Sequence, residues 1–348
     1  MHARARLAAA YSFPWTVYGV SWSNSRSEKV LAVSSITEEY ANHLQILELN
    51  EASPDGADMV DVETSKTSRY TLSVKAGIEH PYPPTRVMWS PAAMPETRLA
   101  TTADYLRIWH PQENGLSLSA ILSNNRTGDS CAPLTSCDWS EMDPNILGTS
   151  SIDTTCTIWD LNNTKQAKKQ IIAHDAEVFD MAFSPLHGGS NIFGSVGADG
   201  SLRVFDIRCL ESCTIAYETP DLSALLRLAW NKHDANFVAV MLVDSPTVLV
   251  LDLRMSASPY AQLTNTKEAH NTNTGRPPSV NAMAWSPTSA HHICTAGEDH
   301  EAIMWDTRVH VPVLQYSGGS YINAIGWSRT APEFLAMSID KTLHVVTI

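Results

Sequence analysis

Long apolar runs and basic residues are both scarce in this sequence, and each scarcity excludes a class of protein. No apolar run approaches the roughly 18 residues that a transmembrane helix needs, so we expect a soluble protein with no membrane association. The 24 Lys and Arg residues are outnumbered by 37 Asp and Glu, which gives a net charge of -13. Such a field repels phosphate backbones, so we do not expect direct nucleic-acid binding.

Cysteines are few and scattered, and no secretory signal accompanies them. The short Leu-Ala run after Arg4 and Arg6 is too brief for the core of a signal peptide. We therefore expect free thiols in a reducing compartment, cytoplasmic and nuclear. The six cysteines are Cys131, Cys137, Cys156, Cys209, Cys213 and Cys294.

Motifs that carry chemistry are also missing. The sequence contains no Gly-rich phosphate loop, nucleophile elbow or His-Glu-x-x-His pattern. His291 and His292, with Cys294 nearby, suggest a metal site, but adjacent residues of a strand point to opposite faces and the paired spacing of zinc ligands is absent. We expect no catalytic residues, no cofactor and no metal, and an enzyme stays a third hypothesis.

What the chain does contain is a recurring hairpin pattern. Small and β-branched residues lead to an Asp at a bend, and an aromatic residue follows. The clearest copy is LGTSSIDTTCTIWDL from Leu147, with Asp153 at the bend and Trp159 after it. Three further copies carry Asp104, Asp199 and Asp299. Weaker copies start at Leu31, where Thr37-Glu38-Glu39 replaces the Asp, at Val238 and at Leu335.

A second marker precedes each hairpin, namely an apolar segment that ends on an aromatic residue. The aromatics are Trp22, Trp89, Trp139, Phe183, Trp230, Trp285 and Trp327. A unit of roughly 40 to 55 residues with several short strands and a Trp-Asp dipeptide is typical of a propeller blade. We predict an all-β fold, a seven-bladed WD-repeat β-propeller that forms one domain over residues 1–348, with insertions at about 50–68 and 271–278.

The seventh copy ends at Ile348 without a fourth strand. Residues 7–13 are the only segment not assigned to a blade. We predict that this N-terminal segment pairs onto the last blade, closes the ring and removes an exposed strand edge.

Particular stretches resemble one family of WD-repeat adaptors, that of the plant protein Transparent Testa Glabra and its animal counterpart. Besides the hairpins from Leu147 and from Ser195, they are PWTVY, HPYP, DYLRIW, CAPLTS, LLRLAWNK and HICTA. The resemblance implies a non-enzymatic scaffold for protein kinases or for MYB and helix-loop-helix transcription regulators. The insertions depart from the family pattern and leave the partner open.

His174 and Asp199 occupy blade-related positions, and His80 and His270 stand at the same place in their own repeats. A catalytic pair would not repeat in this way, whereas a buried carboxylate needs partners in every blade. In the repeats that the chain resembles, such a His donates to the hairpin Asp and a Trp completes the network. The resemblance implies this structural role for His174, Asp199, Asp153, Trp159, Asp299 and Trp305.

An Asp-x-Arg box follows the aromatic position in three successive repeats. It resembles the box with which substrate receptors dock onto cullin-4 ubiquitin ligases. The other interpretation is an ion pair at the surface, which would contribute little to stability. Both interpretations stay open for Asp206 and Arg208, Asp252 and Arg254, and Asp306 and Arg308.

Alignment of the copies also places a set of aromatic, charged and amide residues around one mouth of the ring. Aromatics together with Arg are typical of binding hot spots, although strand residues alternate faces and some would simply pack. We predict a partner-binding top face on a monomeric propeller, formed by Tyr18, Tyr82, Arg86, Glu177, Phe179, Arg227, Asn281, Tyr321 and Asn323.

Overall fold

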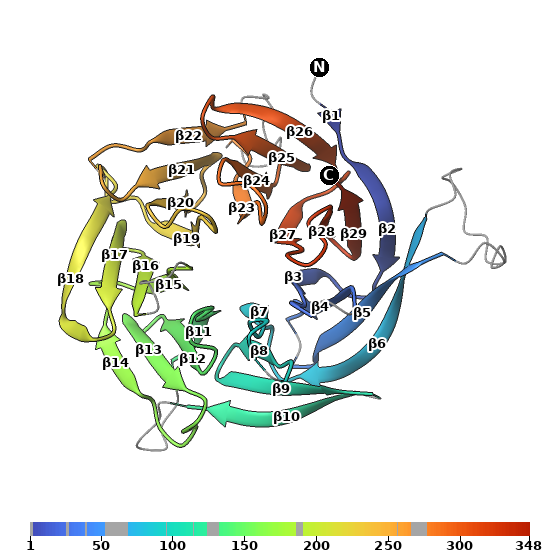
Figure 1. Ribbon diagram of the computed structural model, residues 1–348, viewed down its shortest axis with the longest axis horizontal. Helices are drawn as coiled ribbons and strands as arrows, with labels where there is room; N and C mark the ends of the chain where they lie inside the picture. The colour runs from blue at the N-terminus through green and yellow to red at the C-terminus, as the bar shows by residue number, and fades with distance from the viewer. Residues whose placement is uncertain are drawn as a thin grey trace.

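The computed structural model describes residues 3–25, 28–38, 40–52, 69–94, 96–113, 115–123, 132–185, 191–255, 257–265 and 277–348. Every helix or strand assigned within these ranges is a β-strand. The strands form seven sheets that stand like blades around a central axis (Figure 1). The prediction of a seven-bladed β-propeller is confirmed. No helix in the described part of the chain is long and apolar enough to cross a membrane.

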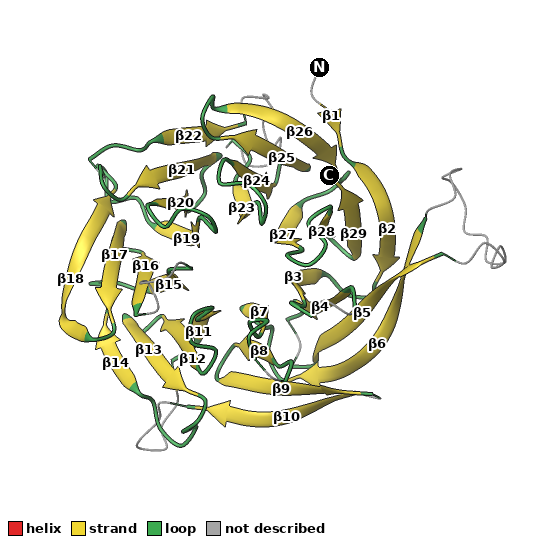
Figure 2. Cartoon of the chain, viewed as in Figure 1, coloured by secondary structure: helices red, strands yellow, loops and turns green. Residues whose placement is uncertain are grey.

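Each blade is a four-stranded antiparallel sheet whose first strand lies at the axis and whose fourth lies outermost (Figure 2). Blade one contains β3 (Val17–Trp22), β4 (Val30–Ser35), β5 (Asn42–Glu51) and β6 (Tyr70–His80). Blade two contains β7 (Arg86–Trp89), β8 (Leu99–Thr102), β9 (Leu106–Gln112) and β10 (Gly115–Leu122). Blade three contains β11 (Leu134–Trp139), β12 (Ile146–Ser151), β13 (Thr155–Asp160) and β14 (Lys169–Ile172).

The remaining blades repeat this plan. Blade four contains β15 (Val178–Phe183), β16 (Ile192–Gly197), β17 (Ser201–Asp206) and β18 (Cys209–Glu218). Blade five contains β19 (Leu225–Trp230), β20 (Phe237–Leu242), β21 (Thr247–Asp252) and β22 (Ala261–Thr264). Blade six contains β23 (Val280–Trp285), β24 (His292–Gly297), β25 (Glu301–Asp306) and β26 (Val311–Ser317).

Blade seven takes its outer strand from the other end of the chain. Its first three strands are β27 (Ile322–Trp327), β28 (Phe334–Ile339) and β29 (Thr342–Thr347). The fourth is β2 (Arg6–Ser12), which pairs antiparallel with β29. The prediction that an N-terminal strand closes the ring is confirmed. The short β1 (Ala3–Arg4) was not foreseen; it adds a parallel strand to β26 of blade six.

The blades are held together by shared cores and by the aromatic residue that ends each inner strand. Trp139 and Trp159 are fully buried. At three seams the indole nitrogen donates to a carbonyl of the preceding inner strand: Trp22 to Gly326 at 3.0 Å, Trp89 to Ser21 at 3.1 Å and Trp285 to Ala229 at 2.9 Å. Neighbouring blades therefore bury each other's apolar faces, and at these three seams they also satisfy a buried donor.

Antiparallel pairing gives the ring two distinct faces. The inner strand of every blade begins at the face where the connections between blades and the turns between the second and third strands lie. We call this the top face, and the face that carries the other turns the bottom face. Most of the expected insertions, residues 53–68 and 271–276, lie outside the described residues.

Candidate protein-docking faces

The inner strands surround a central channel with a cavity of about 280 Å³. Five residues predicted for the top face line this channel: Tyr18, Arg86, Arg227, Asn281 and Asn323. Two of them join neighbouring blades, because Arg227 donates to the Phe179 carbonyl at 3.1 Å and Asn281 donates to the Ile322 carbonyl at 3.1 Å. Phe179 itself is half-buried.

The other three predicted residues are exposed on the top face. They are Tyr82, Glu177 and Tyr321. Tyr82 forms an edge-on pair with Tyr40, with ring centroids 5.8 Å apart, and Tyr321 pairs edge-on with His300 at 5.0 Å. Both tyrosines are thus held in place without being covered.

Sequence reasoning missed further apolar residues on this face, namely Ile36, Tyr40, Ile152, Leu222 and Val243, all of which are exposed. A signal existed for two of them. Ile152 and Val243 directly precede Asp153 and Asp244 in their hairpin turns, where a side chain cannot reach the core. Leu222 lies in the connection between blades four and five and had no such signal.

The exposed charges of the top face are mostly negative. Among the described residues of its turns and inter-blade connections, Lys341 is the only exposed Lys or Arg. The exposed carboxylates belong to Glu38, Asp153, Asp175, Glu177, Asp221, Asp244 and Asp340. An acidic surface with apolar side chains between the charges is suited to a protein partner and repels nucleic acid.

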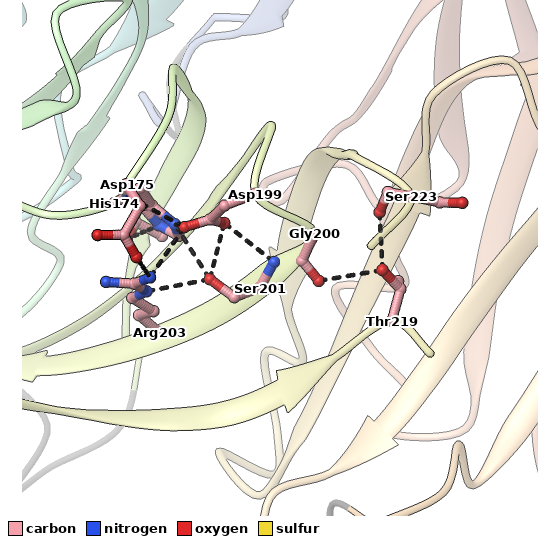
Figure 3. A network of polar contacts seen from close by, with 9 residues as sticks. His174, Asp175, Asp199, Gly200, Ser201, Arg203, Thr219 and Ser223 are labelled. Atoms are coloured by element: carbon pink, nitrogen blue, oxygen red, sulfur yellow. Dashed lines mark hydrogen bonds and ion pairs between the residues drawn. The ribbon is translucent and has the colours of Figure 1, made fainter. Parts of the chain in front are cut away.

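A polar network in blade four anchors this face (Figure 3). His174 Nδ1 lies 2.9 Å from Asp199, and Nε2 lies 2.7 Å from the Ser195 hydroxyl. The Ser201 hydroxyl donates to Asp199 at 2.8 Å, and Arg203 also contacts that carboxylate. Burial lowers the pKa of His174. A neutral imidazole that donates to Asp199 and accepts from Ser195 satisfies both contacts.

Blade two departs from the expected arrangement. His80 Nδ1 contacts the Tyr82 carbonyl at 2.6 Å, while Asp104 is bound by Arg107, so the expected pairing of His80 with its hairpin Asp does not form. His80 Nδ1 donates instead to this carbonyl, which belongs to the proline-rich connection. The second ring nitrogen contacts Thr101 at 3.1 Å, and Trp109 donates to the same hydroxyl at 2.8 Å.

The predicted network residues of blades three and six form separate contacts. Asp153 is exposed and accepts from the Thr155 hydroxyl at 2.6 Å, while Trp159 donates to Thr149 at 2.9 Å. Asp299 accepts from Asn265 at 2.6 Å, and Trp305 donates to Thr295 at 2.8 Å. Burial raises the pKa of Asp299. His270 lies outside the described residues.

In blade one an asparagine replaces the hairpin Asp. Asn42 Oδ1 accepts from the Ser35 hydroxyl at 2.9 Å and from the Thr37 amide at 2.9 Å. We expected Thr37-Glu38-Glu39 at the position of the Asp. That expectation was wrong, because the side chain that accepts these hydrogen bonds is Asn42, five residues after Thr37.

The three Asp-x-Arg boxes adopt one geometry on the bottom face. Arg Nε lies 3.0 Å, 2.9 Å and 3.1 Å from its own Asp in blades four, five and six, and Nη2 lies 2.6 Å, 2.7 Å and 2.7 Å away. The side chains of Arg208, Arg254 and Arg308 remain 68%, 59% and 57% exposed. Such exposed pairs contribute little to stability, but they fix the direction of three cations on adjacent blades.

An ion triad crosses the bottom mouth of the channel. Glu141 follows β11, Lys232 follows β19 and Arg329 follows β27, so the triad joins blades three, five and seven. Glu141 Oε1 lies 3.0 Å from Lys232 and 2.6 Å from Arg329. Burial raises the pKa of Glu141, but the two cations outweigh it and hold the pKa at about 2. The carboxylate is therefore charged at neutral pH.

Neither a metal site nor a reactive buried thiol is found among the described residues. Within the described ranges, no three His, Cys, Asp or Glu side chains lie together as metal ligands would. Burial raises the pKa of the Cys137 and Cys294 thiols to about 12, so both are protonated at neutral pH.

Ring geometry, repeats and docking faces together define a WD-repeat propeller protein, and comparison with known proteins agrees. A family model described as "WD domain, G-beta repeat" matches residues 262–306, which span β23 to β25 and most of β22. The chain is 43% identical over 349 residues to the DDB1- and CUL4-associated factor 7 homolog of Dictyostelium discoideum, covering 97% of this chain and 98% of the relative. The chain belongs to the family of that WD-repeat protein.

Two fungal relatives extend the comparison. An uncharacterised WD-repeat-containing protein of Schizosaccharomyces pombe is 34% identical over 340 residues, covering 88% of this chain and 72% of the relative. A WD-repeat-containing protein of Saccharomyces cerevisiae is 31% identical over 358 residues, covering 93% of this chain and 62% of the relative. The narrower resemblance to the plant protein Transparent Testa Glabra stays a prediction.

Proposed function

We propose that this protein is a non-enzymatic adaptor that holds one protein on its top face and another on its bottom face. The observation that carries the proposal is the chemical difference between the two faces. One presents carboxylates with exposed apolar side chains, and the other presents three oriented arginines. A rigid ring with two unlike docking faces fits a scaffold better than a catalyst.

A second candidate function is that of a substrate receptor for a cullin-4 ubiquitin ligase. The repeated geometry of the Asp-x-Arg boxes favours it, and so does the name of the Dictyostelium relative, which associates that protein with DDB1 and CUL4. In this function Arg208, Arg254 and Arg308 dock onto the ligase, and the top face holds the protein to be modified.

The sequence resemblance supplies the classes of top-face partner. We propose protein kinases, or MYB and helix-loop-helix transcription regulators, met in the cytoplasm and the nucleus. The top face, with carboxylates and exposed apolar side chains, favours a protein as the partner but does not distinguish between these classes.

The test replaces the three box arginines by alanine and measures association with purified DDB1–CUL4 by biolayer interferometry. Loss of three oriented cations should weaken binding by roughly tenfold or more, as expected for hot-spot residues. A charge-matched control carries Arg69→Ala, Lys165→Ala and Lys168→Ala, which remove three other exposed bottom-face cations. Equal binding by parent and box variant would remove the receptor function and leave the adaptor function to be tested on the top face.

A further inference from the structure

Part of the top face combines exposed aliphatic side chains with carboxylates in a regular way. Over blades three to five, Ile152 adjoins Asp153, Leu222 adjoins Asp221, and Val243 adjoins Asp244. All six residues are exposed. We call this surface, together with Asp175 and Glu177 of the connection between blades three and four, the blade 3–5 patch.

The charged residues in the loops of the blade 3–5 patch are all acidic. Its loop segments, residues 151–155, 173–178, 197–201, 219–225 and 242–247, contain no Lys or Arg. In the part of the chain that the structure describes, Arg203 pairs with two of its carboxylates, those of Asp175 and Asp199. Because exposed carboxylates outnumber that cation, the patch attracts positive charge more strongly than the mixed bottom face does.

Leu222 of this patch, in the connection between blades four and five, is held in a strained conformation. Its φ is 56°, a region that bulky residues rarely adopt, and its side chain is 60% exposed. The Leu222 amide donates to the Thr219 carbonyl at 3.0 Å, and the Thr219 hydroxyl donates to the Ser223 carbonyl at 2.9 Å. Thr219 in turn donates its amide to the Gly200 carbonyl at 3.0 Å, and its hydroxyl contacts the same carbonyl (Figure 3).

Gly200 makes this close approach possible. Its φ is 76°, and a Cβ there would lie 2.6 Å from the Thr219 hydroxyl and 2.8 Å from the Leu222 carbonyl carbon. The loop that presents Leu222 therefore rests directly on the blade-four hairpin. An apolar side chain fixed in this way loses little entropy when a partner covers it, which favours affinity.

We propose that the blade 3–5 patch binds a basic segment of a partner protein whose Lys and Arg residues alternate with aliphatic or aromatic side chains. The cations pair with Asp153, Glu177 and Asp221, and an apolar side chain packs on Leu222. This inference rests on the proposed function, because it names the chemistry of the partner that the top face receives. An acidic segment is repelled by the same carboxylates.

Fluorescence anisotropy with the purified full chain and three labelled 15-residue peptides tests the proposal. The probe alternates Lys and Leu, one twin has Glu in place of every Lys, and the other has Ser in place of every Leu. The basic apolar probe should bind about tenfold tighter than either twin, and its affinity should fall as salt rises. Equal binding of the acidic twin would overturn the proposal.

Variants locate the site. Leu222→Asn introduces a residue that tolerates positive φ, so the loop should retain its fold. A second variant, Asp153→Lys with Glu177→Lys, reverses two charges. Each should weaken the basic probe by roughly tenfold. Matched controls on the bottom face are Met255→Ser, which removes another exposed apolar side chain, and Glu96→Lys with Glu333→Lys, which reverses two other exposed charges. An equal loss of affinity for the basic probe in the control variants would show that the probe does not bind at the blade 3–5 patch.

The two proposals fail in different ways. If only the acidic or the polar twin binds, and the top-face variants abolish it, the inferred chemistry is wrong while the adaptor function stands. If no peptide or purified partner responds to the top-face variants, the inference and the adaptor function both fall.

Discussion

His80 and His174 occupy the same place in their repeats, yet their imidazoles form hydrogen bonds with different acceptors. His174 contacts a carboxylate, whereas His80 contacts the Tyr82 carbonyl. Burial lowers the pKa of both imidazoles, and that of His80 falls to about 4. Both imidazoles are therefore neutral at physiological pH, His174 in contact with Asp199 and His80 in contact with the Tyr82 carbonyl.

The depressed pKa of His80 predicts a pH dependence of stability. The ordinary pKa of about 6.5 applies in the unfolded chain, so the unfolded state binds a proton first as the pH falls. The stabilisation from His80 is complete above pH 6.5 and is lost toward pH 4. The advantage of the parent over His80→Gln should shrink by about 2–4 kcal/mol over this range, measured by urea unfolding.

The control for this prediction is His291→Gln, because His291 is exposed. This variant removes an exposed histidine instead of a buried one and is unfolded in urea over the same pH range. A parent curve that stays parallel to that of His80→Gln between pH 7 and pH 4 would show that His80 titrates normally.

At the scale of elements, β2 closes the ring by pairing with β29. Ala8 and Ala9 are buried beneath this pairing, and Phe13 beyond the end of β2 packs against Trp15 with ring centroids 4.3 Å apart. Deletion of residues 1–13 would expose the edge of β29 and remove an aromatic core contact. We expect a fall in the thermal midpoint of more than about 10 °C and concentration-dependent association.

Deletion of residues 1–5 alone is the matched control for closure. It removes β1, whose two residues are exposed, and leaves β2 intact. The control should change the midpoint by no more than about 3 °C. An unchanged midpoint for the longer deletion, followed by differential scanning fluorimetry, would mean that β2 does not hold the ring closed.

The elements themselves could be predicted from sequence because each repeat carries two independent markers. Trp139 ends an inner strand, and Asp153 stands at a hairpin turn, so strand order and blade number follow from their spacing. The closing strand followed from the missing fourth strand of the last repeat. The markers are weakest in blade one, where Asn42 replaces the Asp and the acceptor moved to another position.

The candidate site could be predicted only in part, because exposure depends on how strands meet at the channel. Tyr82 and Tyr321 are exposed on the top face, whereas Arg86 and Asn323 line the channel and are partly exposed. Leu222 could not be found, since its exposure results from a strained loop that rests on Gly200.

At the scale of the whole molecule, residues far apart in sequence meet because the ring brings them together. Glu141 and Arg329 are separated by 188 positions, yet they contact each other across the bottom mouth of the channel. No local pattern in the sequence indicates such a contact. The triad of Glu141, Lys232 and Arg329 ties three non-adjacent blades at the bottom mouth of the channel.

An adaptor with two independent faces must hold both partners at once. The most direct measurement loads immobilised protein with purified DDB1–CUL4 until the signal is saturated, and then adds the basic apolar peptide. We predict that the peptide binds with unchanged affinity, that Leu222→Asn weakens only the second step by roughly tenfold, and that the triple box variant weakens only the first by roughly tenfold or more. Mutual exclusion of the two ligands, or loss of both steps in either variant, would contradict the two-face account.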